Sequence, residues 1–97
     1  MQWSDWSTFA ASIVQYEVDD CGVYELGDGN KSTVYYGSGK VKTRLLDHLN
    51  KKECPLARFY RRQYTLTEEE CRKNEEQLLT EYKNAHGKLP IYNERTS

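Results

Sequence analysis

Two short strand-like stretches, separated by a polar turn, lie in the first half of the chain. Residues 21–26 form the first and run into the turn sequence GDGN, whose residues tolerate positive φ angles. Residues 32–36 form the second, which ends in GSGK before a helical period of about 3.6 residues begins at Val41. The pattern predicts a β-hairpin that is followed directly by an α-helix.

Apolar positions further along the chain predict two helices and one more strand. Residues 41–50 have the spacing of an amphipathic helix, and the β-rich sequence FYRRQYTL at residues 59–66 predicts a third strand. The sequence TEEE, which begins at Thr67, is a capping box that starts a long helix, and Gly87 is placed to end it.

The opening segment, residues 1–17, carries apolar side chains at a helical spacing. We therefore predict an N-terminal helix, with Ser4 as its N-cap. This helix is expected to lie over the hairpin and complete the core. Its aromatic side chains are also typical of a self-association surface, because such residues are enriched at interface centres. The apolar stripe consists of Trp3, Trp6, Phe9, Ile13 and Val14.

These elements define an α+β fold with the order α-β-β-α-β-α. The expected sheet is small and mixed, with three strands (the N-terminal β-hairpin plus a third strand) and flanking helices. The 97 residues suit a single domain, 1–97, in which residues 1–17 form the N-terminal helix and residues 21–93 the core. A chain of this size buries roughly 60% of its unfolded surface, so we expect no large internal cavity.

Side chains capable of chemistry gather on the hairpin and on the helix that follows it. Alternate residues of a strand share a face, so pairing through the turn places Tyr24 and Tyr35 together. Arg44 and His48 are four residues apart and share one face of the helix. Two phenols, a guanidinium and an imidazole are therefore expected to converge.

Glu75, in the last helix, falls within the apolar stripe rather than among the outward-facing acids. A carboxylate at such a position is costly unless it is paired or bound to a cation. Two partners are open at this point: an ion pair with Arg44, or a metal ion.

The same residues resemble the signature of the GIY-YIG nuclease family. Gly22-Val23-Tyr24 and Tyr35-Tyr36-Gly37 stand for the two triplets, with Val23 in place of the usual Ile. The family then has an Arg on the next helix, a His or Tyr one turn later, a metal-binding Glu and a late Asn. The matching residues are Arg44, His48, Glu75 and Asn93. The resemblance covers about residues 21–93.

The resemblance implies a metal-dependent endonuclease that hydrolyses DNA phosphodiester bonds at a site with one metal ion. Glu75 would hold Mg²⁺ or Mn²⁺, which prefer oxygen ligands. Arg44 has the planar fork that suits phosphate oxygens. A tyrosine of the hairpin would act as the general base, and we favour Tyr35 over Tyr24.

The resemblance also implies roles for two further residues. His48 would relay the proton or orient a phenol. Asn93 would bind phosphate or hold the geometry of the site.

Charge is segregated along the chain, although the net charge is only −1. Basic residues concentrate between positions 40 and 62, and acidic residues between 68 and 81. Because the local field steers a polyanion, the overall charge does not exclude DNA. Plain solvated surface is an equal alternative for the three arginines of the expected substrate-binding set, which is Lys40, Arg58, Arg61 and Arg62.

The three cysteines, Cys21, Cys54 and Cys71, show no C-x-x-C spacing. We expect them to be free and at least half-buried rather than zinc ligands. Because the sequence shows no signal peptide and no apolar run of about 20 residues, we expect a cytoplasmic protein with no membrane partner.

DNA is the expected partner. Since almost the whole chain is taken up by the nuclease-like part, binding is expected to be weak, or to depend on a homodimer or a separate DNA-binding partner. The alternative function is a catalytically silent module of the same fold that binds nucleic acid or protein. The set of Tyr24, Tyr35, Arg44, His48 and Glu75 argues against it, because binding alone requires no carboxylate within an apolar stripe.

Overall fold

The predicted hairpin forms the centre of the fold. In the computed structural model, which describes residues 3–94, β2 (Cys21–Gly27) pairs antiparallel with β3 (Thr33–Lys40). β3 continues through the GSGK sequence, where the sequence pattern placed its end. This continuation reflects tertiary pairing: Gly39 and Lys40 lie opposite Gly22 and Cys21 and complete the ladder.

The sheet has four strands in the order β1-β4-β2-β3, and every pair is antiparallel. The predicted third strand is confirmed as β4 (Phe59–Tyr64), and β1 (Ser7–Thr8) is an additional strand beside it. β3 and β4 run in the same direction, but β2 lies between them. No parallel pair therefore forms among the described strands, and the prediction of a mixed sheet is wrong.

The predicted N-terminal helix over residues 1–17 is wrong for most of its length. Of residues 3–17, only α1 (Ala11–Val14) is helical, and it follows β1; residues 1 and 2 lie outside the described part of the chain. Ser4 caps no helix, because its backbone N–H donates to the Arg62 carbonyl and its Oγ accepts from the Arg62 N–H. Pairing with the free edge of β4 thus overrides the helical spacing of the segment.

The aromatic residues of this segment are used inside the domain. Val14 is fully buried and Phe9 packs against the core, whereas Ile13 is exposed. The Arg61 guanidinium lies 4.9 Å from the ring centre of Trp3 and 4.6 Å from that of Trp6. Val14 and Phe9 therefore complete the core as expected, whereas Trp3 and Trp6 contact Arg61 outside the core cluster and Ile13 faces solvent.

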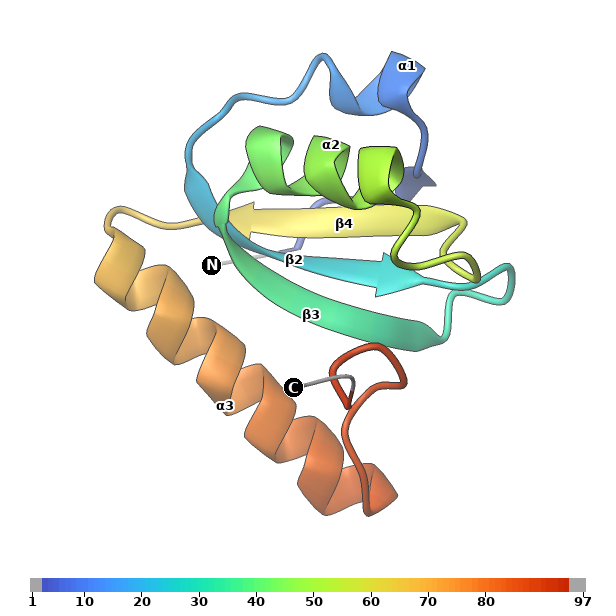
Figure 1. The fold of residues 1–97 in the computed structure, drawn as a ribbon. Coiled ribbons are helices and arrows are strands. Elements are labelled where there is room, and N and C mark those ends of the chain that lie inside the picture. Colours follow the sequence, from blue (N-terminus) through green and yellow to red (C-terminus); the bar gives the residue numbers. More distant parts are fainter. Residues whose placement is uncertain (1–2, 95–97) are drawn as a thin grey trace.

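Helices cover both faces of the sheet (Figure 1). α1 and α2 (Val41–Lys51) lie on one side, and α3 (Glu68–His86) runs diagonally across the other side, below β3. α3 begins and ends as predicted: Thr67 Oγ1 accepts from the Glu70 N–H at 3.1 Å, and Gly87 ends the helix with φ at 77°. The main core lies between the sheet and α2, and it contains Tyr24, Leu26, Val41, Leu45 and Tyr60.

The segment after α3 returns to the outer edge of β3 (Figure 1). There the Tyr92 N–H donates to the Val34 carbonyl at 3.0 Å. The three cysteines are free and at least half-buried, as expected. No helix within residues 3–94 has the length and apolar character required to cross a membrane.

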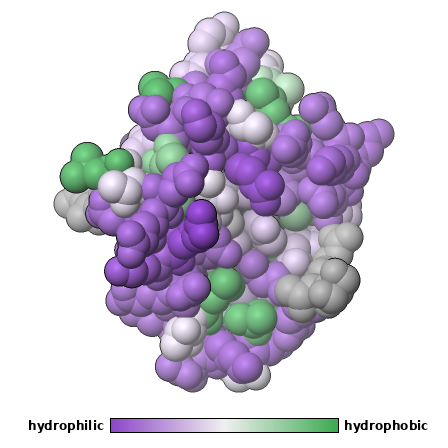
Figure 2. All heavy atoms as spheres, turned by 60° about the vertical axis from the view of Figure 1, so that its left-hand side comes forward, coloured by the Kyte–Doolittle hydropathy of each residue, from purple (hydrophilic) through white to green (hydrophobic). Residues whose placement is uncertain are grey.

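Hydrophilic side chains dominate the face shown in Figure 2, where hydrophobic ones form small separate groups. The exposed large hydrophobic residues in the described part of the chain are Ile13, Tyr16, Val18, Leu56, Leu66 and Ile91. Ile13 on α1, with Tyr16 and Val18 just after it, lies in one stretch of the chain before β2, and the other three lie apart from them in the sequence.

Candidate active site

The Tyr24 side chain lies at the centre of the candidate site. Tyr24 is fully buried on β2 and stands opposite Gly37 of β3. Any Cβ at position 37 would clash with Cζ and Oη of Tyr24. Gly37 is therefore required because the phenol lies across it.

The second phenol and the imidazole join Tyr24 on the α2 side of the sheet. The ring centres of Tyr24 and Tyr35 are 6.1 Å apart, and those of Tyr35 and His48 are 5.0 Å apart. His48 is buried on α2, and its Nε2 lies 2.7 Å from Tyr24 Oη. The structure thus brings together three of the residues that the sequence predicted to converge.

His48 is held from its other side by Glu53, which the sequence did not single out. Glu53 Oε1 lies 3.1 Å from His48 Nδ1. Burial lowers the pKa of His48, and Glu53 opposes part of this shift. His48 is therefore neutral at neutral pH.

Arg44 lies one turn before His48 on α2, and its side chain is exposed beside Gly39. Burial raises the pKa of both Tyr24 and Tyr35, and the Arg44 guanidinium opposes this effect in both cases. Tyr24 in turn raises the pKa of Arg44. An exposed, charged guanidinium beside the two phenols is available to an anionic substrate.

Glu75 lies on α3, on the face of the sheet opposite α2, and the cavity beside it is not lined by Tyr24, Tyr35, Arg44 or His48. Its side chain is half-buried, and its Oε1 accepts a hydrogen bond from Ser38 Oγ on β3. The carboxylate is close enough to raise the pKa of both Tyr24 and Tyr35. Among the ion pairs of residues 3–94, none joins Glu75 to Arg44, which was one of the two partners considered for it; Ser38 is its hydrogen-bond partner instead.

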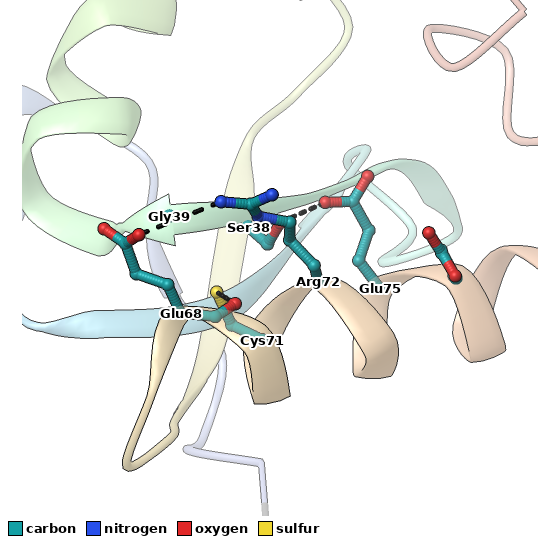
Figure 3. Close-up of a pocket in the computed structure, with 7 residues that line it drawn as sticks. Ser38, Gly39, Glu68, Cys71, Arg72 and Glu75 are labelled. Atoms are coloured by element: carbon teal, nitrogen blue, oxygen red, sulfur yellow. Dashed lines mark hydrogen bonds and ion pairs between the residues drawn. The ribbon is translucent and has the colours of Figure 1, made fainter.

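A cavity of about 390 Å³ opens beside Glu75, between α3 and the end of β3. Figure 3 shows Glu68, Arg72 and Glu75 projecting from the helix toward the strand. Arg72 and Glu68 form an ion pair of 3.8 Å. The cavity is lined by Ser38, Gly39, Glu68, Cys71, Arg72, Glu75 and Glu76.

The donor atoms at this cavity fit a weakly held divalent cation. They include carboxylate and hydroxyl oxygens, which Mg²⁺ and Mn²⁺ prefer, although the lining also contains the Arg72 guanidinium, which opposes a cation. The described residues contain no group of three or more His, Cys, Asp or Glu that could hold a metal. Mg²⁺ commonly binds through one or two carboxylates together with substrate phosphates and keeps several waters, so a single carboxylate such as Glu75 is compatible with a cation that arrives with the substrate.

Asn93 holds the backbone of β3. Its Oδ1 accepts from the Tyr36 N–H, and its Nδ2 donates to the Tyr36 carbonyl, each at 2.9 Å. Both ends of the amide are therefore used on the strand that carries Tyr35 and Gly37. Of the two roles implied for Asn93, this geometry supports holding the site in place.

The predicted substrate-binding arginines do not form one track. Arg61 Nε lies 2.6 Å from Glu25 Oε1, and Arg62 Nε lies 2.8 Å from Glu17 Oε1. Adjacent strand residues point to opposite faces of a sheet, so these two guanidinium groups lie on opposite sides of β4.

The remaining two basic residues differ in their surroundings. Arg58 donates from one guanidinium nitrogen to the carbonyls of Pro55 and Ala57. Lys40 is exposed at the N-cap of α2, one turn before Arg44. Of the four predicted substrate-binding residues, Lys40 is therefore the one nearest to Arg44 along the chain.

Comparison with known proteins shows the family. Residues 2–85 match the family described as Domain of unknown function (DUF7508), and the chain belongs to it. The comparison found no matching curated protein and no matching solved structure. The matched segment contains Tyr24, Tyr35, Arg44, His48 and Glu75 and ends before Asn93.

Proposed function

We propose that the protein is a metal-dependent endonuclease that hydrolyses DNA phosphodiester bonds with a GIY-YIG-type site. The observation that supports this most is the buried Tyr24–His48 hydrogen bond, at a place where Arg44 and Glu75 both act on the phenols. The sequence resemblance supports the same function. Hydrolysis of a phosphodiester needs an activated water and charge stabilisation, and this set supplies groups for both.

Arg44 binds the scissile phosphate in this proposal. Its guanidinium is exposed and offers paired N–H donors in a geometry that matches phosphate oxygens. A divalent cation at Glu75 would neutralise phosphate charge and polarise the bond to phosphorus.

Tyr35 is the better placed general base. Tyr24 is fully buried and its hydroxyl is already hydrogen-bonded to His48, whereas Tyr35 is only partly buried and can meet a water molecule. Burial and the Glu75 charge raise the pKa of Tyr35, and Arg44 opposes them. Neutralisation of the Glu75 charge therefore favours the phenolate.

The function is tested by nicking of supercoiled plasmid DNA with Mg²⁺ or Mn²⁺, with EDTA as a control. Glu75→Gln is expected to reduce the rate roughly 100-fold or more, because it removes the charge that anchors the cation. The shape of the side chain is kept, so circular dichroism and the midpoint of thermal unfolding should stay close to wild type.

The matched control is Glu81→Gln, which removes one exposed charge from the same helix. It should nick DNA at the wild-type rate. Wild-type nicking by Glu75→Gln would show that Glu75 is not the metal ligand.

A catalytically silent binding module remains the second candidate. The observation that favours it is the raised pKa of both phenols, which disfavours a phenolate in the free protein. Retention of DNA by the wild type without nicking, with either metal present, would support this candidate and exclude the nuclease.

A further inference from the structure

A hydrogen-bonded chain joins Tyr24 to His48 and His48 to Glu53. Tyr24 Oη contacts His48 Nε2 at 2.7 Å, and His48 Nδ1 contacts Glu53 Oε1 at 3.1 Å. Both ring nitrogens of His48 are thus engaged. The proposed roles of Arg44 and Glu75 make no use of Glu53.

The partners of His48 determine which of its nitrogens carries the proton. A carboxylate accepts hydrogen bonds and has no hydrogen to donate, so Nδ1 must be the protonated nitrogen facing Glu53. A neutral imidazole carries one proton, and Nε2 is then an acceptor. The Tyr24 hydroxyl consequently donates to Nε2.

The way in which α2 ends places the Glu53 carboxylate next to Nδ1 of His48. Lys52 adopts a left-handed conformation with φ at 53°, and its N–H donates to the Leu49 carbonyl. The Glu53 N–H then donates to the carbonyl of His48 at 3.3 Å. This pair of bonds is a Schellman motif, which turns the chain back over the last helical turn. Glu53 therefore contacts His48 through its backbone and its side chain.

We propose that Glu53 is a positioning residue: its carboxylate holds the Nδ1–H of His48 and so keeps Nε2 free to accept the proton of Tyr24. The catalytic consequence rests on the proposed nuclease function. The Tyr35 side chain is hydrogen-bonded to Tyr24. When Tyr35 gives its proton to the Tyr24 oxygen, the Tyr24 proton passes to Nε2. Tyr35 becomes a phenolate, Tyr24 stays neutral, and the imidazolium is stabilised by the Glu53 carboxylate.

His48 and Glu53 lie close enough to solvent for a proton on His48 to be released to water. A cavity of about 170 Å³ lies beside His48, and the Glu53 side chain is 44% exposed. The proton taken up by His48 can return to water there. The cavity is lined by Tyr35, His48, Glu53, Cys54 and Tyr92.

The first experiment reads the tautomer of His48 by ¹⁵N NMR of the imidazole nitrogens, which needs neither DNA nor metal. Wild type is expected to show a protonated Nδ1 at neutral pH. Glu53→Ala should increase the fraction with a protonated Nε2, whereas Glu53→Asp, which keeps the carboxylate, should retain more of the wild-type tautomer. Glu81→Ala is the matched control and should leave the spectrum unchanged.

The same spectra give the pKa of His48. Glu53 raises this pKa, so Glu53→Ala should lower it further. The other groups that face His48 contribute equally in both proteins, so they do not alter the direction. These groups are Tyr24, Tyr35, Arg44, Asp47, Lys52, Cys54, Arg58 and Tyr92.

The second experiment measures plasmid nicking by the same variants. Glu53→Ala should lower kcat about 10- to 100-fold, as do other losses of a group that orients a functional histidine, with little change in KM. Because neutral His48 is the proton acceptor, activity rises as pH rises through its pKa. The acidic limb of the pH profile should therefore move to lower pH in Glu53→Ala.

The outcomes separate this proposal from the proposed function. A protonated Nε2 in the wild type, or an unchanged tautomer in Glu53→Ala, overturns the role of Glu53. A wild-type nicking rate in Glu53→Ala also overturns that role while leaving the nuclease intact. A wild type with the expected tautomer and no nicking overturns the nuclease, and with it the relay.

Discussion

The contact between Tyr24 and Gly37 gives a physical reason for the presence of both triplets, Gly22-Val23-Tyr24 and Tyr35-Tyr36-Gly37, in one sequence. Tyr24 is the last residue of the first triplet, and Gly37 is the last residue of the second. They face each other across the β2–β3 ladder, and the phenol occupies the space that a side chain at position 37 would fill. The glycine therefore permits the Tyr24–His48 hydrogen bond.

We predict that Gly37→Ala destabilises the protein by about 1 to 3 kcal/mol, because the added methyl group overpacks a closed site. Urea unfolding gives the change in free energy. The shift of the phenol should also weaken the hydrogen bond to His48, and NMR of the imidazole would detect this.

Gly29→Ala provides the control for this substitution. Gly29 is exposed in the hairpin turn, and a Cβ there meets no atom within 4 Å. Equal unfolding free energies for the two variants would contradict the proposed close packing at Gly37.

Individual site residues were predictable to different degrees. Strand alternation and helical spacing were sufficient to bring Tyr24, Tyr35 and His48 together, because these are properties of regular elements. Glu53 was not predictable, since it lies in the turn after α2 and reaches His48 through a left-handed residue. Ser38 was missed because GSGK has the composition of a turn.

At the scale of elements, local signals succeeded where tertiary contacts agreed with them. The capping box at Thr67 and the glycine at position 87 both act as predicted on α3. The opening segment has an equally clear helical spacing, yet residues near Ser4 follow the edge of β4. A spacing pattern carries no information about a free strand edge elsewhere in the fold.

The C-terminal segment is an element without regular structure that fixes the position of β3. We predict that Asn93→Ala lowers the free energy of unfolding by about 1 to 3 kcal/mol, because two partly buried backbone groups of Tyr36 lose their partners. Urea unfolding would measure the loss.

Asn84→Ala is a suitable comparison for Asn93→Ala, since Asn84 is an exposed asparagine on α3. It should leave the unfolding free energy within about 0.5 kcal/mol of wild type. If Asn93→Ala behaves in the same way, the amide does not hold β3.

At the scale of the whole molecule, Glu17 joins the N-terminal part to the sheet. Its carboxylate accepts hydrogen bonds from Tyr60 Oη at 2.6 Å, Arg62 Nε at 2.8 Å and Tyr64 Oη at 2.9 Å. Burial alone would raise the pKa of Glu17, but these bonds and the Arg62 charge bring it below its ordinary value of 4.5.

The lowered pKa of Glu17 predicts that the free energy of unfolding depends on pH. A carboxyl whose pKa is lowered by folding stabilises the native state above its unfolded pKa, and the contribution is lost as pH falls through the folded value. Glu17→Gln should therefore lower the free energy of unfolding by about 1 to 3 kcal/mol at pH 7. The difference from wild type should shrink below about pH 4.

Urea unfolding between pH 3 and pH 7 tests this expectation, with Glu81→Gln as the control for loss of one exposed charge. A difference between Glu17→Gln and wild type that stays constant over this range would show that the ionised carboxylate is not the stabilising form.

The segment that carries Asn93 also bears on aggregation. An unpaired strand at the edge of a sheet is a template for a strand of another molecule. Here the amide of Asn93 and the Tyr92 N–H already occupy backbone groups of Tyr36 and Val34. Removal of the residues after position 89 would open this edge to intermolecular β-pairing. The segment at residues 90–94 thus protects the β3 edge from pairing with a strand of another copy of the protein.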